Sequence, residues 1–422
     1  MIFSIKYPAG VKIKRFKAVC AFILAGFSGM SVSAQLTSAA LQQYLSESLN
    51  DKKSAINYRE DIQEFYSLIH YQTAWIQPKD TSRLAGLLDH LSSAAYWGLD
   101  EKDYQYNFIS AYKSGAYLFK SEEDSLKAEL LFTEAAIHFY SDAAYGNTTP
   151  ALGYVGIKYR PGCNNIAVSL AENILKNRPA LPGSYTQPPV AEVTAIQDKI
   201  SWMIGVMNES DFKEVTIISK RANAENKPLC QKLYQLGILD SANENISENV
   251  MKQKIKEAQM LFNLPANGEL KPECIRELNV PLKNRLAQLT LSINYYRWLS
   301  CLAQSQPVIV VNIPAAYLKV YDGNQVILEM KMVVGKPSTP TFTLASVVDE
   351  VIIYPYWHVP FSIATKELLP AIKRDPSFLD ANNYQVLNKA GKIVTPNSVN
   401  WNALSRNYFP YTIRQSTGCD NS

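Results

Sequence analysis

The sequence has 422 residues, of which 47% are hydrophobic and 19% are charged, and its formal net charge at pH 7 is +4. Five basic and no acidic residues lie among the first 34, so the remaining 388 residues carry a net charge of −1. A near-neutral surface without a basic stripe argues against nucleic acid as a partner, and a chain of this length is expected to contain more than one domain.

The first 34 residues have the pattern of a secretory signal peptide. Basic residues between Lys6 and Lys17 precede an apolar run from Ala18 to Met30, and the small residues Ser31-Val32-Ser33-Ala34 follow. The apolar run is too short for a membrane anchor, which needs about 20 residues. We therefore predict a signal peptide over residues 1–34 that is cleaved after Ala34, and no membrane span in the mature chain.

Apolar residues recur at helical spacing through much of residues 35–228, which predicts a mostly helical domain. The strongest predicted helix runs from Ser125 to Tyr145 and ends at Gly146, a residue typical of helix ends. Its predicted apolar stripe consists of Leu126, Leu130, Ile137, Tyr140 and Ala144. We expect the aromatic side chains of this domain to pack in its core rather than to form a platform for sugars.

A smaller helical unit is predicted over residues 229–300. It contains a helix around Gln259, followed by the turn sequence Asn267-Gly268. A further helix, Arg285 to Leu299, leads into the next part of the chain. Core packing alone explains the periodic apolar residues of this unit, so an ordinary three-helix packing unit is one interpretation of it.

The pattern changes from helices to strands after residue 305. Val308 to Ile313 is short, apolar and β-branched, which predicts a buried strand. Tyr317 to Tyr321 suits a second strand, and Asp322-Gly323 indicates a tight hairpin turn. The return strand, Val326 to Val334, alternates between apolar and polar residues.

Shorter elements are predicted further along. Ser362 is expected to cap a short helix, and Pro370 is expected to interrupt it. Residues Tyr384–Leu387 and Lys392–Val394, joined through Ala390-Gly391, predict a second hairpin.

Several motifs in this last region resemble the catalytic domain of L,D-transpeptidases, cell-wall enzymes that cross-link peptidoglycan. The similarity is greatest to the large Gram-negative branch of the family. The motifs are Val-Asn-Ile-Pro-Ala at 311–315, Leu-x-Val-Tyr-Asp-Gly at 318–323, Val-Val-Gly-Lys-Pro at 333–337, Thr-Pro-x-Phe at 339–342, Tyr-Pro-x-Trp-x-Val-Pro-x-Ser-Ile at 354–363, Glu-Leu-Leu-Pro at 367–370 and Arg-Asp-Pro-x-x-Leu at 374–379.

The resemblance extends to the order of the preceding parts. Residues 35–228 resemble the helical scaffold domain of the large enzymes, and residues 229–300 resemble a peptidoglycan-binding-like module with a linker helix. The family resemblance implies a multidomain α+β protein. Its parts are an all-α scaffold, a small helical module, and an incomplete, mostly-β L,D-transpeptidase domain over residues 305–422. The resemblance also implies peptidoglycan stem peptides as partners. The predicted signal peptide indicates a periplasmic location, and we predict no cofactor.

The family's catalytic motif, Ser-His-Gly-Cys-x-Arg, does not occur in this sequence. The resemblance implies acyl transfer by a thiolate that a histidine activates, with backbone donors for the oxyanion. Cys419 has Asp420 beside it, and no histidine follows His358. A negative neighbour raises a thiol pKa, so we do not assign Cys419 as the nucleophile and name no catalytic residue.

The remaining cysteines and histidines indicate no other chemistry. Without Cys20, five widely spaced cysteines are left, an odd set that is not a disulfide framework, although one or two bridges are possible in an oxidising compartment. The four histidines lack the spacing of metal ligands, so we predict no metal site.

By resemblance, four residues are placed near the substrate groove: Trp357, Pro360, Arg414 and Gln415. The structural alternatives are a core position for Trp357 and a solvated charge for Arg414.

Three hypotheses follow from the sequence. The first is a peptidoglycan-remodelling protein of this family that is C-terminally truncated and inactive as written. The second is a non-catalytic periplasmic scaffold that binds peptidoglycan. The third is a fragment that a second polypeptide complements. Under the first hypothesis, we expect an exposed sheet edge and an unfinished core after residue 305.

Overall fold

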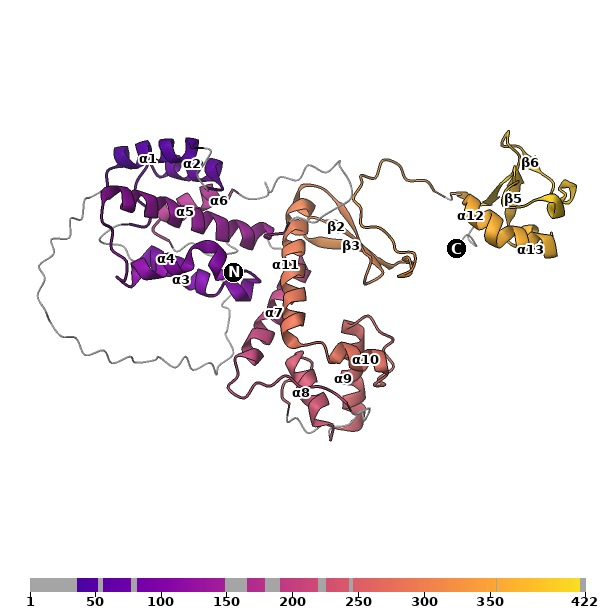
Figure 1. Ribbon diagram of the computed structural model, residues 1–422, viewed down its shortest axis with the longest axis horizontal. Helices are drawn as coiled ribbons and strands as arrows, with labels where there is room; N and C mark the ends of the chain where they lie inside the picture. Colours follow the sequence, from indigo (N-terminus) through magenta and orange to yellow (C-terminus); the bar gives the residue numbers. More distant parts are fainter. Residues whose placement is uncertain are drawn as a thin grey trace, which may run out of the picture. The chain divides into compact units, whose positions relative to one another are not determined.

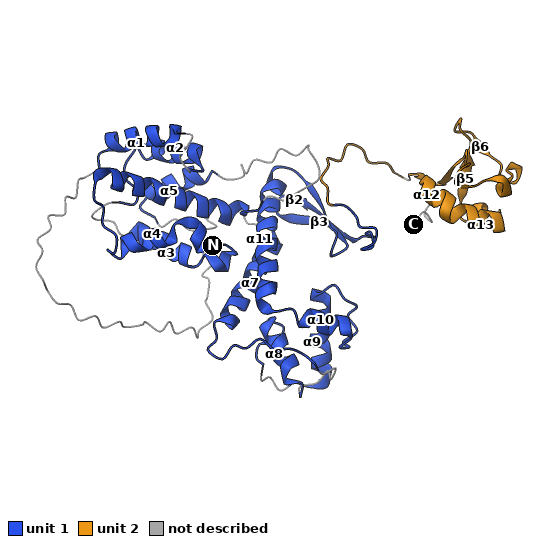
Figure 2. Cartoon of the chain, in the orientation of Figure 1, with its two compact units in different colours: residues 1–151, 159–342 blue, residues 152–158, 343–422 orange. Residues whose placement is uncertain are grey.

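The computed structural model describes residues 36–51, 56–76, 82–148, 165–178, 190–218, 225–242, 246–353 and 355–417. The predicted signal peptide and Cys419 lie outside these residues. The chain divides into two compact units (Figure 2): the described residues up to Phe342 form unit 1, and those from Thr343 form unit 2. This division lies inside the region that the sequence predicts as one C-terminal domain.

Helices make up most of unit 1, and a small sheet follows them (Figure 1). The first group of helices is α1 (Ser38–Asn50), α2 (Arg59–Leu68), α3 (Ser82–Ser92), the 3₁₀ turns Ala94–Trp97 and Glu101–Tyr104, α4 (Tyr106–Lys113), α5 (Glu122–Tyr145) and α6 (Ile166–Leu175). They are followed by α7 (Ala191–Met207), α8 (Lys227–Gln235), α9 (Glu248–Leu261), α10 (Pro272–Leu278) and α11 (Leu282–Ser305).

Helix α5 is the central helix of the first group, and it agrees with the sequence prediction. The Ser121 hydroxyl accepts a hydrogen bond from the Asp124 backbone N–H at 3.1 Å, and acidic residues fill the first turn, where the helix dipole favours negative charge. The helix ends at Gly146. Four of the five predicted stripe residues are buried in a shared core, and Ala144 packs at its margin.

A buried carboxylate fastens the chain after α2 to helix α5. Glu129 is fully buried, and its two oxygens accept backbone N–H bonds from Ala74, Trp75 and Ile76. The Tyr66 hydroxyl donates to Glu129 at 3.2 Å. A charged side chain is tolerated in an apolar core only when its acceptors are satisfied in this way.

Helices α7 and α11 lie side by side (Figure 1), and between them they contact α5, the 3₁₀ turn Ala94–Trp97 and strand β2. Near its middle, α11 meets the backbone of the first helical group. The Asn294 amide donates to the Gly98 carbonyl at 3.1 Å and accepts from the Asn147 N–H at 3.2 Å. The buried Arg297 guanidinium donates to the Trp97 carbonyl at 2.7 Å. The helix is therefore fixed to the scaffold by polar contacts within one turn.

Helices α8, α9 and α10 form a separate small core with the ends of α7 and α11. Buried Gln259 on α9 organises the loop that precedes α10. Its amide oxygen accepts the Gly268 N–H at 2.8 Å, and its amide nitrogen donates to Asn267 and to the Glu269 carbonyl, both at 2.9 Å. Gly268 has φ +78°, a conformation that glycine adopts without strain.

The first sheet is the antiparallel meander β1 (Val308–Asn312), β2 (Tyr317–Asp322) and β3 (Gln325–Lys331), with the predicted turn at Gly323. The prediction that β1 is buried is wrong, because only one face of the sheet packs on α7 and α11. The other face consists of aliphatic residues that pair across the three strands. We call it the aliphatic face: Ile309, Val311, Leu318, Val320, Leu328 and Met330.

Unit 2 contains a second sheet with the strand order β4-β7-β5-β6 and short helices beside it. Its strands are β4 (Trp357–His358), β5 (Tyr384–Leu387), β6 (Ile393–Val394) and β7 (Thr412–Gln415). Its helices are α12 (Phe361–Ile363), α13 (Leu369–Arg374) and α14 (Phe378–Ala381). A π-helical turn (Ala364–Leu368) joins α12 to α13, and two 3₁₀ turns follow at Pro396–Ser398 and Trp401–Ala403. The predicted hairpin is confirmed as β5 and β6.

Two local predictions in unit 2 are wrong. The helix begins at Phe361 after Pro360, so Ser362 lies inside it and caps nothing. Pro370 does not interrupt the helical path, because it lies in the first turn of α13, directly after the π-helical turn. The missing N–H of a proline is tolerated in a first turn.

The predicted fold class, a multidomain α+β protein, is confirmed by the helical N-terminal region and the antiparallel strands that follow it. Across the described ranges, no helix has the length and apolar character that crossing a bilayer requires.

Candidate functional site

The structure brings three of the four predicted groove residues together on neighbouring strands of unit 2. Trp357 and Gln415 are directly paired between β4 and β7, and Arg414 is paired with His358. Pro360 lies just beyond β4, where the Val359 N–H donates to the Ile413 carbonyl at 2.8 Å. The four residues are thus positioned by one pair of strands and by the start of α12, which follows β4.

Strand alternation divides these residues between the two faces of the sheet. Trp357 and Gln415 share a face with Tyr384 of β5, whose ring stacks on Phe378 of α14. Trp357 lies at the margin of this face, with 41% of its surface exposed. A core position for Trp357 is therefore excluded, and its indole presents an apolar surface to solvent.

Arg414 points to the opposite face. Its guanidinium carbon lies 4.1 Å from the ring centroid of Tyr356, and its Nε donates to the Gln385 side chain at 2.9 Å. A ring below and an amide beside the guanidinium restrict its orientation. Arg414 is therefore a positioned cation rather than a freely solvated charge, and its remaining donors suit a carboxylate.

The described cysteines do not supply a nucleophile. Cys230 and Cys274 are buried free thiols, and Cys301 is disulfide-bonded. Burial raises the pKa of Cys230, and burial together with Glu273 and Glu277 raises the pKa of Cys274 to about 11. A thiol must ionise to attack, so neither free cysteine suits that role. No cluster of metal-binding side chains occurs among the described residues either.

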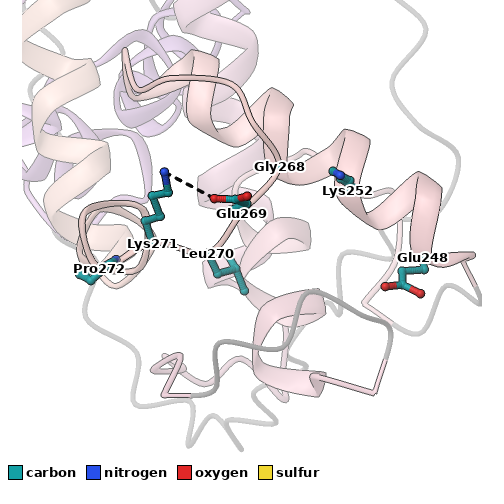
Figure 3. A pocket seen from close by; sticks show the side chains of 7 residues that line it. All are labelled: Glu248, Lys252, Gly268, Glu269, Leu270, Lys271 and Pro272. Carbon is teal, nitrogen blue, oxygen red and sulfur yellow. Dashed lines mark ion pairs between the residues drawn. The ribbon is translucent and has the colours of Figure 1, made fainter.

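A second candidate site lies in the small helical module, where a depression of about 470 Å³ opens between α9 and the loop before α10 (Figure 3). Its lining residues are Glu248, Lys252, Gly268, Glu269, Leu270, Lys271 and Pro272. Glu269 and Lys271 form an ion pair at 3.4 Å. The sequence prediction missed this site, although the turn at Asn267-Gly268 after Gln259 was the feature that could have located it.

Comparisons with known proteins match two parts of the chain. Residues 60–186 match the Scaffold domain family, and residues 306–419 match the L,D-transpeptidase catalytic domain family. A curated protein of Haemophilus influenzae, described as an L,D-transpeptidase, is 36% identical over 110 residues, which cover 26% of this chain and 22% of that protein. The matched stretch thus spans about a fifth of the relative's length.

Proposed function

Because residues 306–419 belong to the L,D-transpeptidase catalytic domain family, we propose that this protein takes part in peptidoglycan remodelling. The reaction is acyl transfer between stem peptides: a thiolate attacks a peptide carbonyl, the leaving amine departs with a proton, and a second amine takes the acyl group. The match over the C-terminal strands is the observation that carries this proposal. The predicted signal peptide over residues 1–34 supports a periplasmic location.

Within this reaction, the described residues bind and position the stem peptide and do not supply the nucleophile. The exposed Trp357 indole offers an apolar surface on one face of the sheet, and the Arg414 guanidinium offers donors for a carboxylate on the opposite face, so a stem peptide reaches both only around the edge strand β4. Pro360 and Gln415 border the same strand pair. The raised thiol pKa values of Cys230 and Cys274 support the assignment of a binding role alone.

The proposal is tested with the full chain and synthetic stem peptides. We expect peptide binding that Trp357→Ala and Arg414→Gln each weaken, whereas Lys392→Gln, an exposed change on the nearby hairpin turn, has no effect. Mass spectrometry of the peptides detects any acyl transfer. Transfer that Cys419→Ala abolishes would contradict the assignment of a binding role alone.

A second candidate function is a non-catalytic scaffold that binds peptidoglycan through its helical parts. The depression in the α8–α10 module favours it, because its volume of about 470 Å³ falls within the range of small-molecule sites. Sedimentation with purified sacculi tests this function. If the folded full chain stays in the supernatant, the scaffold function is excluded.

A further inference from the structure

We propose that His138 is a pH sensor that determines how firmly the scaffold holds helix α11. Protonation of the imidazole steadies the chain segment on which α11 docks, so the docking is firmer in acid than in base. This inference goes beyond the proposed function and does not depend on it. It rests on three linked contacts: His138 with Asp142, Asp142 with Tyr104, and the segment that ends at Tyr104 with α11.

The Asp142 carboxylate links His138 to the 3₁₀ turn Glu101–Tyr104. Nε2 of His138 lies 3.2 Å from Oδ2 of Asp142, and the Tyr104 hydroxyl donates to the same oxygen at 2.8 Å. Tyr104 is fully buried and the Asp142 side chain is 10% exposed, whereas the His138 side chain is 29% exposed. The imidazole can therefore exchange protons with solvent, while the carboxylate that it contacts depends on its protein partners.

Most of the groups around His138 favour its protonated form. The groups that face it come from three elements: Asp142 and Glu134 of α5, Asp103 and Tyr104 of the 3₁₀ turn, and Tyr58 at the start of α2. Burial lowers the pKa of His138, but the hydrogen bond and charge of Asp142, together with the charges of Glu134 and Asp103, raise it above its ordinary value of 6.5. The fold therefore favours the imidazolium.

The segment formed by residues 94–104 carries two carbonyls to which α11 is bound. The Arg297 guanidinium donates to the Trp97 carbonyl at 2.7 Å, and the Asn294 amide donates to the Gly98 carbonyl at 3.1 Å. Both side chains are almost fully buried. The docking of α11 therefore depends on how well this segment is fixed in place.

Tyr104 fixes the end of this segment to α5 through Asp142. An imidazolium holds the carboxylate by a charge-assisted hydrogen bond, which is about twice as strong as a neutral one, and so fixes the acceptor of the Tyr104 hydroxyl. Arg297 is the charged group that faces this cluster from α11. Burial lowers the pKa of Arg297 to about 10, and Tyr104 and Asp142 oppose this shift. The cluster thus connects the protonation of His138 to α11.

The direction of the pH dependence follows from the raised pKa of His138. A group whose pKa is raised in the fold contributes stability that is complete below its ordinary pKa, here 6.5, and that is lost as the pH rises through the folded-state value. The contacts of the 94–104 segment, and with them the docking of α11, should therefore weaken as the pH rises above 6.5.

The test is hydrogen exchange of the full chain at pH 6 and at a series of pH values stepped up from 6.5, corrected for the intrinsic pH dependence of exchange. Protection of the α11 amides around Arg297 should fall about threefold in the wild-type chain, because one hydrogen bond changes from charge-assisted to neutral and one of its partners is partly exposed. The His138→Gln variant should show no such fall.

His90→Gln is the matched control. His90 is also partly buried, and its Nδ1 lies 3.0 Å from the Tyr140 hydroxyl on α5. Burial lowers the pKa of His90 below 6.5, so this histidine does not titrate in the range tested. The fall in protection should therefore persist in His90→Gln.

Tyr104→Phe tests the route from His138 to α11. It removes the hydroxyl that donates to Asp142 and keeps the ring, whose centroid lies 4.9 Å from that of His138. Nuclear magnetic resonance should still detect the titration of His138, whereas the protection of α11 should no longer follow it. A merely structural role of Tyr104 would instead lower the protection equally at every pH.

Four outcomes would overturn the inference. The first is constant protection in the wild-type chain, and the second is a fall that persists in His138→Gln. The third is an unchanged fall in Tyr104→Phe, which decides the matter even if His138→Gln does not fold. The fourth is protection that rises with pH, because repulsion between the imidazolium and Arg297 would then outweigh the Asp142 link.

Discussion

The Lys319 ammonium lies 3.0 Å from the Glu192 carboxylate and thereby joins strand β2 to helix α7. The Tyr321 hydroxyl donates to the same carboxylate oxygen at 2.9 Å. Burial alone would raise the pKa of Glu192, but the bonds from Lys319 and Tyr321 lower it below its ordinary value of 4.5. The interaction therefore favours the ionised carboxylate and holds the first sheet on the helices.

Glu192→Gln should release this sheet. We expect the amides of residues 308–331 to exchange hydrogen faster by a factor that corresponds to about 1 kcal/mol, the usual contribution of one partly buried hydrogen bond. Because the pKa of Glu192 is lowered in the fold, its contribution is present above pH 4.5 and is lost as the pH falls through the lowered value. Hydrogen exchange measured at pH 6 and at a series of pH values stepped down from 4.5 tests both statements.

Glu329→Gln is the matched control for this prediction. Glu329 also pairs with Lys319, at 3.4 Å, but its side chain is 47% exposed whereas that of Glu192 is 19% exposed. Solvent weakens exposed pairs, so Glu329→Gln should change the exchange much less. Equal effects of the two variants would contradict the role assigned to Glu192.

Glu129→Gln should destabilise the helical part of unit 1. Both carboxylate oxygens accept backbone N–H groups, so the amide nitrogen of a glutamine would face a donor and leave it unpaired. An unpaired buried donor costs about 1–3 kcal/mol. Thermal unfolding followed by far-UV circular dichroism measures the loss. Lys127→Gln, an exposed change on the same helix, is the control and should leave the unfolding temperature unchanged.

The pH dependence of the wild-type chain provides a second test of Glu129. Burial raises its pKa above the ordinary 4.5, although the backbone bonds from Ala74, Ile76 and Trp75 oppose this shift. The stability that comes from the neutral carboxyl is therefore complete below pH 4.5 and is lost as the pH rises through the folded-state pKa. The Glu129→Gln variant should lack this dependence.

The elements that the sequence predicts well are those set by neighbouring residues. The Asp322-Gly323 turn, the β5–β6 hairpin and the apolar stripe of α5 each depend on residues within a few positions of one another. Elements set by distant contacts were predicted less well. Strand β1 has the composition of a buried strand, and only its position on α7 and α11 shows that half of it faces outward.

The candidate sites show the same limit. Trp357 and Gln415 pair although they lie 58 positions apart in the sequence, and family resemblance was what located them. That Arg414 lies on the opposite face of the sheet from these two residues could be determined only from the strand register. The sequence shows only the Asn267-Gly268 turn near the depression beside Gln259, and a turn does not by itself indicate a concave surface. The depression depends on the three-dimensional approach of Gly268 to Lys252.

Gly146→Ala tests how closely α11 approaches the scaffold. An added Cβ would lie 2.2 Å from the Asn294 backbone oxygen, and backbone cannot move aside cheaply. Gly115→Ala measures the cost of a positive φ (+77°) alone, because nothing lies within 4 Å of its added Cβ, whereas Gly146 (φ +79°, ψ 149°) adds to the contact a backbone conformation that essentially only glycine adopts. Gly115→Ala should cost about 1–2 kcal/mol from backbone strain alone. If Gly146→Ala costs no more in far-UV unfolding, the close approach is wrong.

The aliphatic face of the first sheet should bind hydrophobic dyes. Four of its residues, Ile309, Val311, Leu328 and Met330, are each 41–49% exposed, and cross-strand pairing makes them contiguous. Contiguous apolar surface attracts apolar ligands, whereas single exposed residues do not. The double variant Leu328→Thr/Met330→Thr should therefore lower anilinonaphthalene sulfonate fluorescence markedly, with β propensity retained by threonine.

Val333→Thr is the control for this prediction. Val333 follows β3 and is 98% exposed, more than any residue of the face, but it pairs with no strand. If the dye responds to exposed area alone, Val333→Thr should lower the fluorescence at least as much per residue as the double variant. If it responds to the contiguous face, Val333→Thr should have almost no effect. The second result is expected, because the paired residues present one surface and the side chain of Val333 stands alone.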